Sequence, residues 1–213
     1  MSYLIPLEQT RRELVVLNSR FIATLAPIAS VEEARAFIQS IRAEFADASH
    51  NVPAYLLGGG HSVMEYCSDD GEPAGTAGRP ALAVLRGSGL GDLALVVTRY
   101  FGGTLLGTGG LVKAYTQAAQ LVVNTVPLAR RVSVHLALLA IPYNLLERVR
   151  FITARHNGVV LSQDFAADVT LTLQFPVEML AAFQSELREL SAGKLQAEVL
   201  ETTQRLVPVE ALP

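Results

Sequence analysis

Hydrophobic residues recur along the chain at two spacings, every second residue in some stretches and every third or fourth in others, which predict strands and helices respectively. Ser30 and Glu33 have the spacing of a helix capping box. Ala34, Ile38 and Ile41 then fall on one helical face. The elements expected in the first part of the chain are a hairpin over 14–25 with its turn at 18–20, a helix over 30–48, a strand over 50–57, a helix over 76–85, a strand over 93–97 that is covered on both faces, and a helix opened by Gly109 and Gly110.

A second pattern begins where the composition shifts, near residues 127–131. Its expected elements are a strand over 132–138, a helix over 145–152, strands over 159–161 and 169–175, a helix over 180–190 and a strand over 195–199. This βαββαβ order is typical of the ferredoxin-like arrangement. The sequence therefore predicts an α+β protein with one domain at 1–130 and a small ferredoxin-like domain at 131–213.

Composition narrows the possible functions. Of the 213 residues, 50% are hydrophobic and 17% are charged, as in a globular protein with a substantial core. A formal net charge of −3 argues against a surface that binds polyanions everywhere, although it leaves room for a local basic patch. The single cysteine, Cys67, excludes an internal disulfide and a CxxC metal site. Because no signal-peptide pattern and no long apolar run is present, we expect a soluble cytoplasmic protein without a membrane partner.

Glycine is concentrated in one part of the chain. Fourteen of the sixteen glycines lie at 58–110. Glycine is favoured where φ must be positive, or where a ligand or a second stretch of backbone must come close. Across 93–129 the only residues of formal charge are Arg99, before the last group of glycines, and Lys113, after it. A glycine loop that opens a helix presents free backbone N–H groups, which is a place where anions bind.

We therefore expect this loop and its two flanking cations to bind an anion or a nucleic acid, with an aromatic ring available to stack on a base. The candidate residues are Arg99, Tyr100, Gly102, Gly103, Gly107, Gly109, Gly110 and Lys113. In the alternative interpretation, the glycines allow a strand and a helix to pack closely while the cations pair with Asp69 or Asp70. The spacing excludes a Walker phosphate-binding loop, because Thr108 stands where that motif needs lysine.

An acidic turn lies upstream of the glycine loop. Asp69, Asp70 and Glu72 carry oxygen ligands that could hold Mg²⁺ or act as acid and base. His50, at a turn beside the glycine-rich region, is the histidine that could join them. The alternative is an Asx-type turn whose aspartates cap the following segment. None of the four histidines has zinc-ligand spacing, so we predict neither a metal site nor a cofactor.

Together these motifs resemble the signature of a known family, the Impact (YigZ) family. The matching stretches are SDDGEP at 68–73, GTAG at 75–78, VVTRYFGG at 96–103 and GGLVKAY at 109–115, with NSRF at 18–21 and HN at 50–51. The resemblance covers nearly the full chain. Lys113 stands where the family usually has arginine. Lysine cannot form the bidentate hydrogen bonds with phosphate that arginine forms.

The resemblance implies that the first domain is similar to the second domain of ribosomal protein S5, an α/β layer with a left-handed crossover. It also implies a link to translation, since eukaryotic relatives regulate the kinase that stops initiation during amino-acid starvation. The family has no agreed catalytic residues. We therefore expect a non-enzymatic regulator that binds RNA, the ribosome or translation-regulating proteins through the surface at 68–113.

Two alternative functions stay open at this point. The first is a metal-assisted phosphate-ester hydrolase that uses Asp69, Asp70 and Glu72. The second is a module that binds only proteins, whose partner would be lost when the chain is truncated from Val132 onward. The sequence alone does not choose between them.

Overall fold

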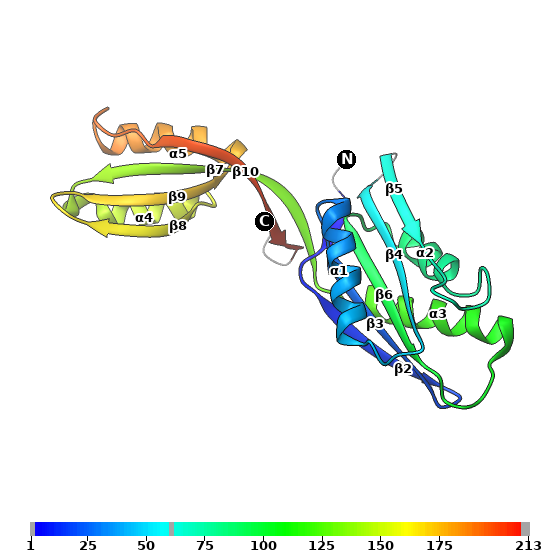
Figure 1. The fold of residues 1–213 in the computed structure, drawn as a ribbon. Coiled ribbons are helices and arrows are strands. Elements are labelled where there is room, and N and C mark those ends of the chain that lie inside the picture. The colour runs from blue at the N-terminus through cyan, green and yellow to red at the C-terminus, as the bar shows by residue number, and fades with distance from the viewer. Residues whose placement is uncertain (1–2, 60–61, 210–213) are drawn as a thin grey trace. The chain divides into compact units, whose positions relative to one another are not determined.

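The chain divides into two units, which are drawn as ribbons in Figure 1. The structure is a computed structural model that describes residues 3–59 and 62–209. Within these residues, the first unit comprises 3–130 together with 207–209, and the second comprises 131–206. Both are α+β and are built on antiparallel sheets. The outermost ends of the two predicted domains, residues 1–2 and 210–213, lie outside the described residues.

A five-stranded antiparallel sheet, in the order β2-β3-β6-β4-β5, forms the centre of the first unit. Helix α1 packs against one face of this sheet, and helices α2 and α3 cover the other face (Figure 1). The elements are β2 (Thr10–Val16), β3 (Ser19–Pro27), α1 (Val31–Glu44), β4 (His50–Gly59), β5 (Ser62–Cys67), α2 (Gly78–Gly87), β6 (Leu93–Tyr100) and α3 (Gly107–Val123).

The middle strand, β6, is buried on both faces, as the uncharged run at 93–97 predicts. Seven of its eight residues are buried. Ala94 and Val96 contact the core under α1, whereas Leu95 and Val97 contact the core under α2 and α3. Because side chains alternate along a strand, Arg99 is directed to the same side as Leu95 and Val97.

The predicted hairpin forms between β2 and β3, but its turn lies earlier than the composition of residues 18–20 indicates. Val16 pairs with Ser19, so the loop consists of Leu17 and Asn18 alone. Both residues have positive φ, 45° and 66°. Two-residue hairpin loops with positive φ at both positions match the right-handed twist of the strands, which explains why the tight turn is adopted.

The capping box that the sequence predicts is present at the start of α1. The Ser30 hydroxyl accepts a hydrogen bond from the backbone N–H of Glu33 at 3.1 Å, and the Glu33 carboxylate accepts one from Ala29 N–H at 2.7 Å. The helix ends at Glu44, four residues before the predicted end. Beyond this point the Phe45 carbonyl accepts hydrogen bonds from Ala48 N–H and from the Asn51 side chain of β4, and Ser49 N–H donates to the Arg99 carbonyl instead of extending the helix.

The second unit has the βαββαβ order that the sequence predicts, and its two α-helices cover one face of the sheet. Strand β7 pairs with β10 on one side and with β9 on the other, and β8 follows β9. The last strand begins three residues later than predicted. The elements are β7 (Leu128–Ile141), a 3₁₀ turn (Tyr143–Leu145), α4 (Leu146–Arg155), β8 (Val159–Phe165), β9 (Val169–Pro176), α5 (Val177–Leu190) and β10 (Glu198–Pro208).

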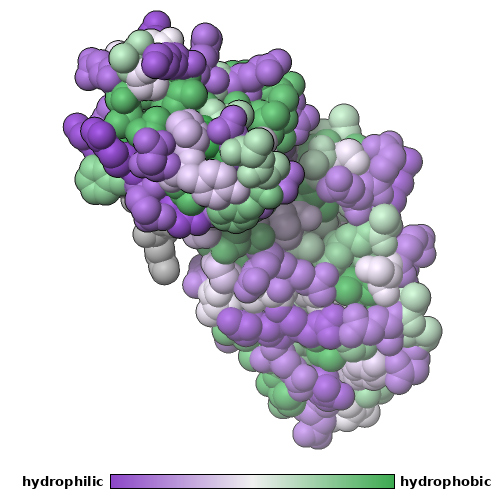
Figure 2. Space-filling model, turned by 90° about the vertical axis from the view of Figure 1, so that its left-hand side faces the viewer, coloured by the Kyte–Doolittle hydropathy of each residue, from purple (hydrophilic) through white to green (hydrophobic). Residues whose placement is uncertain are grey.

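The surface mixes hydrophobic and hydrophilic residues. Figure 2 shows this on the side of the molecule that it presents, where hydrophobic residues lie between hydrophilic ones. The exposed large hydrophobic side chains of the second unit include Phe151 and Phe165. Scattered exposed residues of this kind are normal for folded proteins. Within 3–59 and 62–209, no helix is both long enough and apolar enough to cross a bilayer.

The hydrophobic pattern of the sequence misses two strands, the short β1 (Leu4–Pro6), which pairs with the start of β7, and β5. Strand β5 lies at the edge of the sheet, beyond the area that α1 covers (Figure 1). Met64 is 56% exposed and Tyr66 is 45% exposed. The large side chains of β5 lie on a face that is exposed to solvent. Hydrophobic and polar residues therefore do not alternate clearly along this strand, and periodicity cannot reveal it.

Candidate functional site

The acidic turn joins β5 to α2 and is folded around the carboxylate of Asp69. This carboxylate accepts hydrogen bonds from the backbone N–H groups of Gly75 at 2.8 Å, Ala77 at 3.1 Å and Gly78 at 2.8 Å. Since Gly78 begins α2, Asp69 places its negative charge where a helix start favours it. A methyl group on Gly78 would lie 2.6 Å from the Ser68 carbonyl oxygen, so the turn requires glycine there.

Replacing Asp69 should weaken this turn in a pH-dependent way. Burial acts to raise the pKa of Asp69, but the three backbone hydrogen bonds outweigh burial and hold the pKa below its usual value of 3.8. We expect Asp69→Asn to lower the free energy of unfolding by about 1 kcal/mol at neutral pH, because the amide turns an N–H group toward one of the three donors. The measurement is denaturant unfolding of both proteins from neutral pH to about pH 2.

The sign of the pH effect follows from the lowered pKa. A carboxylate whose folded-state pKa is depressed contributes stability above its unfolded-state pKa, and this contribution is lost as pH falls through the folded-state pKa. The difference between wild type and Asp69→Asn should therefore be constant near neutral pH and shrink below about pH 4. A difference that stays the same down to the lowest pH would contradict this assignment.

Asp70 and His50 tie the acidic turn to the beginning of β4. One oxygen of the Asp70 carboxylate accepts a hydrogen bond from Arg42 of α1 at 2.5 Å, and the other accepts one from the backbone N–H of Asn51 at 2.7 Å. The His50 Nδ1 atom lies 2.8 Å from the Asp70 carbonyl oxygen. Both oxygens of this carboxylate are therefore occupied by donors of the protein itself.

Glu72 is buried, with only 8% of its surface exposed, and it holds a cluster between the turn, β6 and α3. Its Oε1 atom accepts hydrogen bonds from Arg99 Nη1 and from the Tyr115 hydroxyl, each at 2.7 Å. The His50 Nε2 atom lies 3.8 Å from the other carboxylate oxygen. Burial raises the pKa of Tyr115 far above its usual value, and the Glu72 carboxylate raises it further, so the hydroxyl keeps its proton and stays a donor.

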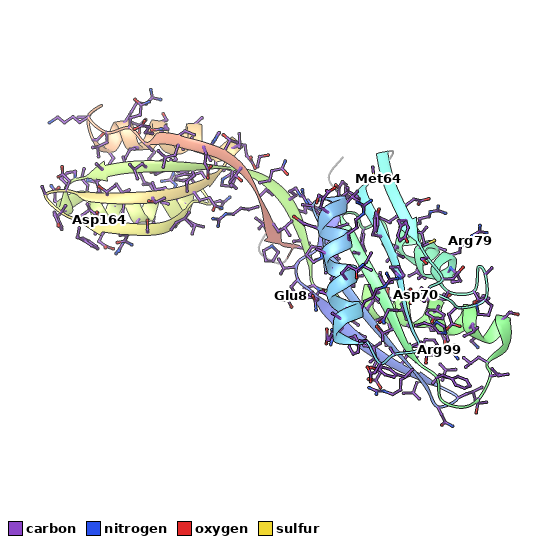
Figure 3. The ribbon with its side chains drawn as sticks, in the orientation of Figure 1. Glu8, Met64, Asp70, Arg79, Arg99 and Asp164 are labelled. Carbon is purple, nitrogen blue, oxygen red and sulfur yellow. The ribbon has the colours of Figure 1, made fainter. Side chains whose placement is uncertain are left out.

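Arg99 faces inward. Its guanidinium carbon lies 5.5 Å from the centre of the Phe21 ring and 5.6 Å from that of Phe101, and the residue is only 5% exposed. Asp70 and Arg99 are labelled near each other in the first unit in Figure 3, but the partner of Arg99 is Glu72, not an aspartate. This buried ion pair clamps β6 to the acidic turn and withdraws Arg99 from any anion outside the protein.

The acidic side chains do not form an open metal site. The oxygens of Asp69 face backbone N–H groups, those of Asp70 face Arg42 and a backbone N–H, and Glu72 faces Arg99. In the part of the chain that the structure describes, no group of three or more His, Cys, Asp or Glu side chains could hold a metal ion. The carboxylates act as structural acceptors, so the geometry lends no support to the hydrolase alternative.

The first glycine of the loop is present for close packing. A methyl group on Gly102 would lie 2.1 Å from the carbonyl carbon of Asn18 and 2.4 Å from the backbone nitrogen of Ser19. The Gly102 N–H donates to the Ser19 hydroxyl at 3.1 Å. Glycine at this position therefore lets the loop rest directly on the β2–β3 turn.

Tyr100 is held by neighbours beside this contact. Its hydroxyl donates to Asp47 Oδ1 at 2.7 Å, and the Arg20 guanidinium carbon lies 5.5 Å from the centre of its ring. The hydrogen bond to Asp47 raises the pKa of the hydroxyl. Stacking a base on this ring would compete with Arg20, so Tyr100 is a weaker candidate for base binding than its place in the sequence indicates.

The rest of the glycine loop is open to solvent. Gly103 and Gly107 have φ of +83° and +70°, and a methyl group on either would meet nothing within 4 Å. A methyl group on Gly109 would also meet nothing within 4 Å, whereas a methyl group on Gly110 would lie 3.0 Å from Leu106 Cβ. This part of the loop leaves its backbone accessible from outside.

Helix α3 starts without a capping side chain. Leu106 precedes the helix and supplies no side-chain hydrogen bond, and the first turn contains no acidic residue. By contrast, Ser30 caps α1 and Asp69 bonds to the N–H groups at the start of α2. Lys113 is exposed on α3, and within 3–59 and 62–209 its ammonium has no bonding partner. We call Gly103, Gly107, Gly109, Gly110 and Lys113 the open helix start.

The structure thus divides the predicted site into two parts. One part is an internal clamp, in which the residues bond to one another or to the backbone; it consists of Asp69, Asp70, Glu72, His50 and Arg99. The other part is the open helix start, which is accessible to solvent. The sequence pattern does not reveal Tyr115 or Arg42 as members of the site, although they complete the clamp. In the sequence, Tyr115 is recognisable only as one residue of an apolar helical face. That pattern predicts burial of the ring but not the hydrogen bond of its hydroxyl.

These features define a class: an α+β protein of two units, in which a clamped acidic turn lies beside a glycine-rich helix start. Two family models match, the Impact N-terminal domain at 17–123 and a domain of unknown function (DUF1949) at 139–194. The chain is 39% identical to the IMPACT family member YigZ of Escherichia coli (strain K12), over 94% of this chain and 98% of the relative. The chain belongs to the IMPACT family.

Other relatives agree with this assignment. An IMPACT family member from Haemophilus influenzae is 40% identical over 93% of this chain and 97% of the relative. A crystal structure described as that of a hypothetical protein is 39% identical, with a TM-score of 0.62 over 94% of this chain and 98% of that chain. The structure of the two-domain translational regulator Yih1 has a TM-score of 0.34 at 22% identity over 55% of this chain and 46% of that one, too distant to bear on function.

Proposed function

We propose that this protein is a non-enzymatic regulator linked to translation and that it binds RNA, free or in the ribosome, through the open helix start. The observation that carries the proposal is the uncapped beginning of α3, which is also free of acidic residues and followed by the exposed Lys113. Membership of the IMPACT family supports the link to translation, because the family signature implies that role.

The chemistry of a helix start favours phosphate. The first N–H groups of a helix lack partners within the helix and carry a partial positive charge. Glycine at 107, 109 and 110 leaves no side chain to hold a phosphate away from these N–H groups. Lys113 adds a full positive charge on the same helix. The combination suits the phosphate backbone of RNA, which we prefer to an acidic protein as the ligand.

The proposed contact is small, so binding should be weak and sensitive to salt. Arg99 contributes nothing directly, because it is buried against Glu72. Its role in the proposal is to hold β6 and the acidic turn together under the loop. With one lysine and one helix start at the site, only a few phosphates are neutralised, and few counterions are released on binding.

We also propose that 1–130 and 131–213 are separate domains, similar to the second domain of ribosomal protein S5 and to ferredoxin respectively. The βαββαβ order and the position of β10 beside β7 support the second of these likenesses. The sheet with α1 on one face and α2 and α3 on the other supports an α/β layer for the first.

Lys113→Ala should weaken the binding of single-stranded RNA several-fold and reduce the slope of log affinity against log salt by about 1, since one phosphate contact is removed. Fluorescence anisotropy with labelled RNA at several salt concentrations measures both quantities. The chain offers a matched control, because its only other lysine is the exposed Lys194 of the second unit. Lys194→Ala should leave both quantities unchanged.

Equal losses for the two lysine variants would mean that RNA responds to overall charge, and the proposal would be wrong. The absence of any RNA binding by the wild-type chain would also overturn it. In that case, the protein-binding alternative would be the one to test, by capture experiments with known components of the translation machinery.

A further inference from the structure

A pocket of about 350 Å³ lies on the α1 side of the first unit, on the face of the sheet opposite to α2 and α3. Its floor is formed by β4 and β5, and its wall by α1. The pocket exists because α1 contacts β6 and β4 but leaves the edge strand β5 uncovered (Figure 1). A volume of this size falls in the range of small-molecule sites.

Two tyrosines form the floor of the pocket. Tyr55 of β4 and Tyr66 of β5 are directly opposite in the strand register, and their rings are stacked with centres 5.4 Å apart and an angle of 24° between the planes. Tyr55 is 7% exposed, whereas Tyr66 is 45% exposed. Tyr55 therefore supports Tyr66 from the core side, and Tyr66 presents ring surface to the pocket. An aromatic ring held in this way is a stacking platform for a flat ligand.

Two arginines and a glutamine line the wall. Arg35, Gln39 and Arg42 are spaced four and three residues apart on α1, which places them on one face of the helix. Arg35 is exposed and, in the part of the chain that the structure describes, its guanidinium has no bonding partner. Arg42 uses one of its N–H groups on Asp70, which fixes the side chain at the edge of the pocket and leaves its other donors available.

The charge of the pocket favours an anionic ligand. The described residues that line the pocket include two arginines and no carboxylate. Arg42 is paired with Asp70, but this carboxylate also accepts a hydrogen bond from Asn51 N–H. Guanidinium groups bind phosphate through paired N–H donors. A ligand that satisfies both the tyrosine floor and the arginine wall combines a flat aromatic ring with a phosphate. A nucleotide has this composition.

We propose that this pocket binds a nucleotide, with its base stacked on Tyr66 and its phosphate held by Arg35 and Arg42. The nucleotide can be free or can be one residue of a single-stranded RNA. The site does not depend on the open helix start, which lies over the other face of the sheet. The two sites can therefore fail separately in experiments.

Isothermal titration calorimetry of the full chain with AMP, UMP and adenosine, and with single-stranded RNA of about ten residues, tests the proposal. Tyr66→Ala should weaken nucleotide binding roughly 5- to 100-fold, because the stacking contact is lost. Tyr66→Phe keeps the ring and should bind as wild type does. Arg35→Ala should weaken the binding of AMP several-fold without affecting adenosine, which has no phosphate. Arg148→Ala, which removes another exposed helical arginine, is the control and should change nothing.

The outcomes separate the possible sources and the possible failures. Binding of AMP or UMP that depends on Tyr66 and Arg35 identifies a free nucleotide as a sufficient ligand. Binding of RNA alone, with the same dependence, identifies a residue of RNA. Failure of all these ligands to bind, or binding that Tyr66→Ala and Arg35→Ala leave intact, overturns the proposal. If Lys113→Ala weakens RNA binding while Tyr66→Ala changes the binding of neither nucleotides nor RNA, this site is overturned and the proposed function stands.

Discussion

Glu72→Ala is expected to lower the free energy of unfolding by about 3–5 kcal/mol. The substitution leaves the guanidinium of Arg99 buried without a counter-charge and removes the acceptor of the Tyr115 hydroxyl. Both groups would then have to stay unsatisfied in the interior or draw water into it. Breaking a buried ion pair from one side is costly because the remaining charge has lost its compensation, whatever the pair itself contributes.

Denaturant unfolding of wild type, Glu72→Ala and two further variants measures this effect. Glu72→Gln keeps the shape and an acceptor for Tyr115 but removes the charge, so we expect a smaller loss. Glu65→Ala breaks the exposed ion pair with Arg86 and should leave stability unchanged, because exposed pairs contribute little. If Glu72→Ala were as stable as Glu65→Ala, the buried clamp would have no energetic importance.

Gly102→Ala is the second large effect that we expect, with a loss of at least about 2 kcal/mol. The added methyl group would meet backbone atoms of Asn18 and Ser19, not the end of a flexible side chain. The β2–β3 turn is tight and has positive φ at both of its residues, so it has little freedom to move away. Thermal and denaturant unfolding measure the loss, and chemical shifts of the turn residues should report its displacement.

Gly109→Ala is the matched control for this prediction. Gly109 lies in the same loop-to-helix segment, but a methyl group there meets nothing within 4 Å. Because alanine favours a helix more than glycine does, we expect this variant to be more stable by about 0.5–1 kcal/mol. Similar losses for the two variants would show that the segment tolerates no change at all and that the contact with Asn18 is not the cause.

The elements that periodicity predicts best are those buried on one face or on both. The capping box at Ser30, the uncharged run that opens β6 and the alternating strand β9 form where the pattern places them. The pattern does not predict strand β5, because an edge strand with exposed large side chains has no periodic signature. The pattern extends α1 too far because tertiary hydrogen bonds engage the backbone beyond Glu44, with Phe45 accepting from Asn51 and Ser49 donating to Arg99.

The site was predictable only in part, for a similar reason. The alternation of Leu95, Val97 and Arg99 along β6 already indicates that Arg99 shares the side of buried residues. Its partner could not be predicted, because the carboxylate that meets it depends on how Asp69 folds the acidic turn around its three backbone hydrogen bonds. Glu72 then points inward while the aspartates do not.

The tyrosine pocket carried no signal at all in the sequence. Tyr55 and Tyr66 are brought together by the register of β4 and β5, and the hydrophobic pattern does not predict the second of these strands. Arg35 and Arg42 have the spacing of one helical face, but such a stripe on its own is typical of an ordinary solvated surface. Only the folded sheet shows that the stripe faces two rings.

The scarcity of lysine makes contacts of this protein unusually easy to map. Lys113 and Lys194 are the only lysines, and each lies exposed in a different unit. A reagent that crosslinks amines to a bound macromolecule can therefore attach, apart from the amino terminus, at one place in each unit. Sequencing a single modified peptide from a cellular sample would then report which unit was in contact and what it touched.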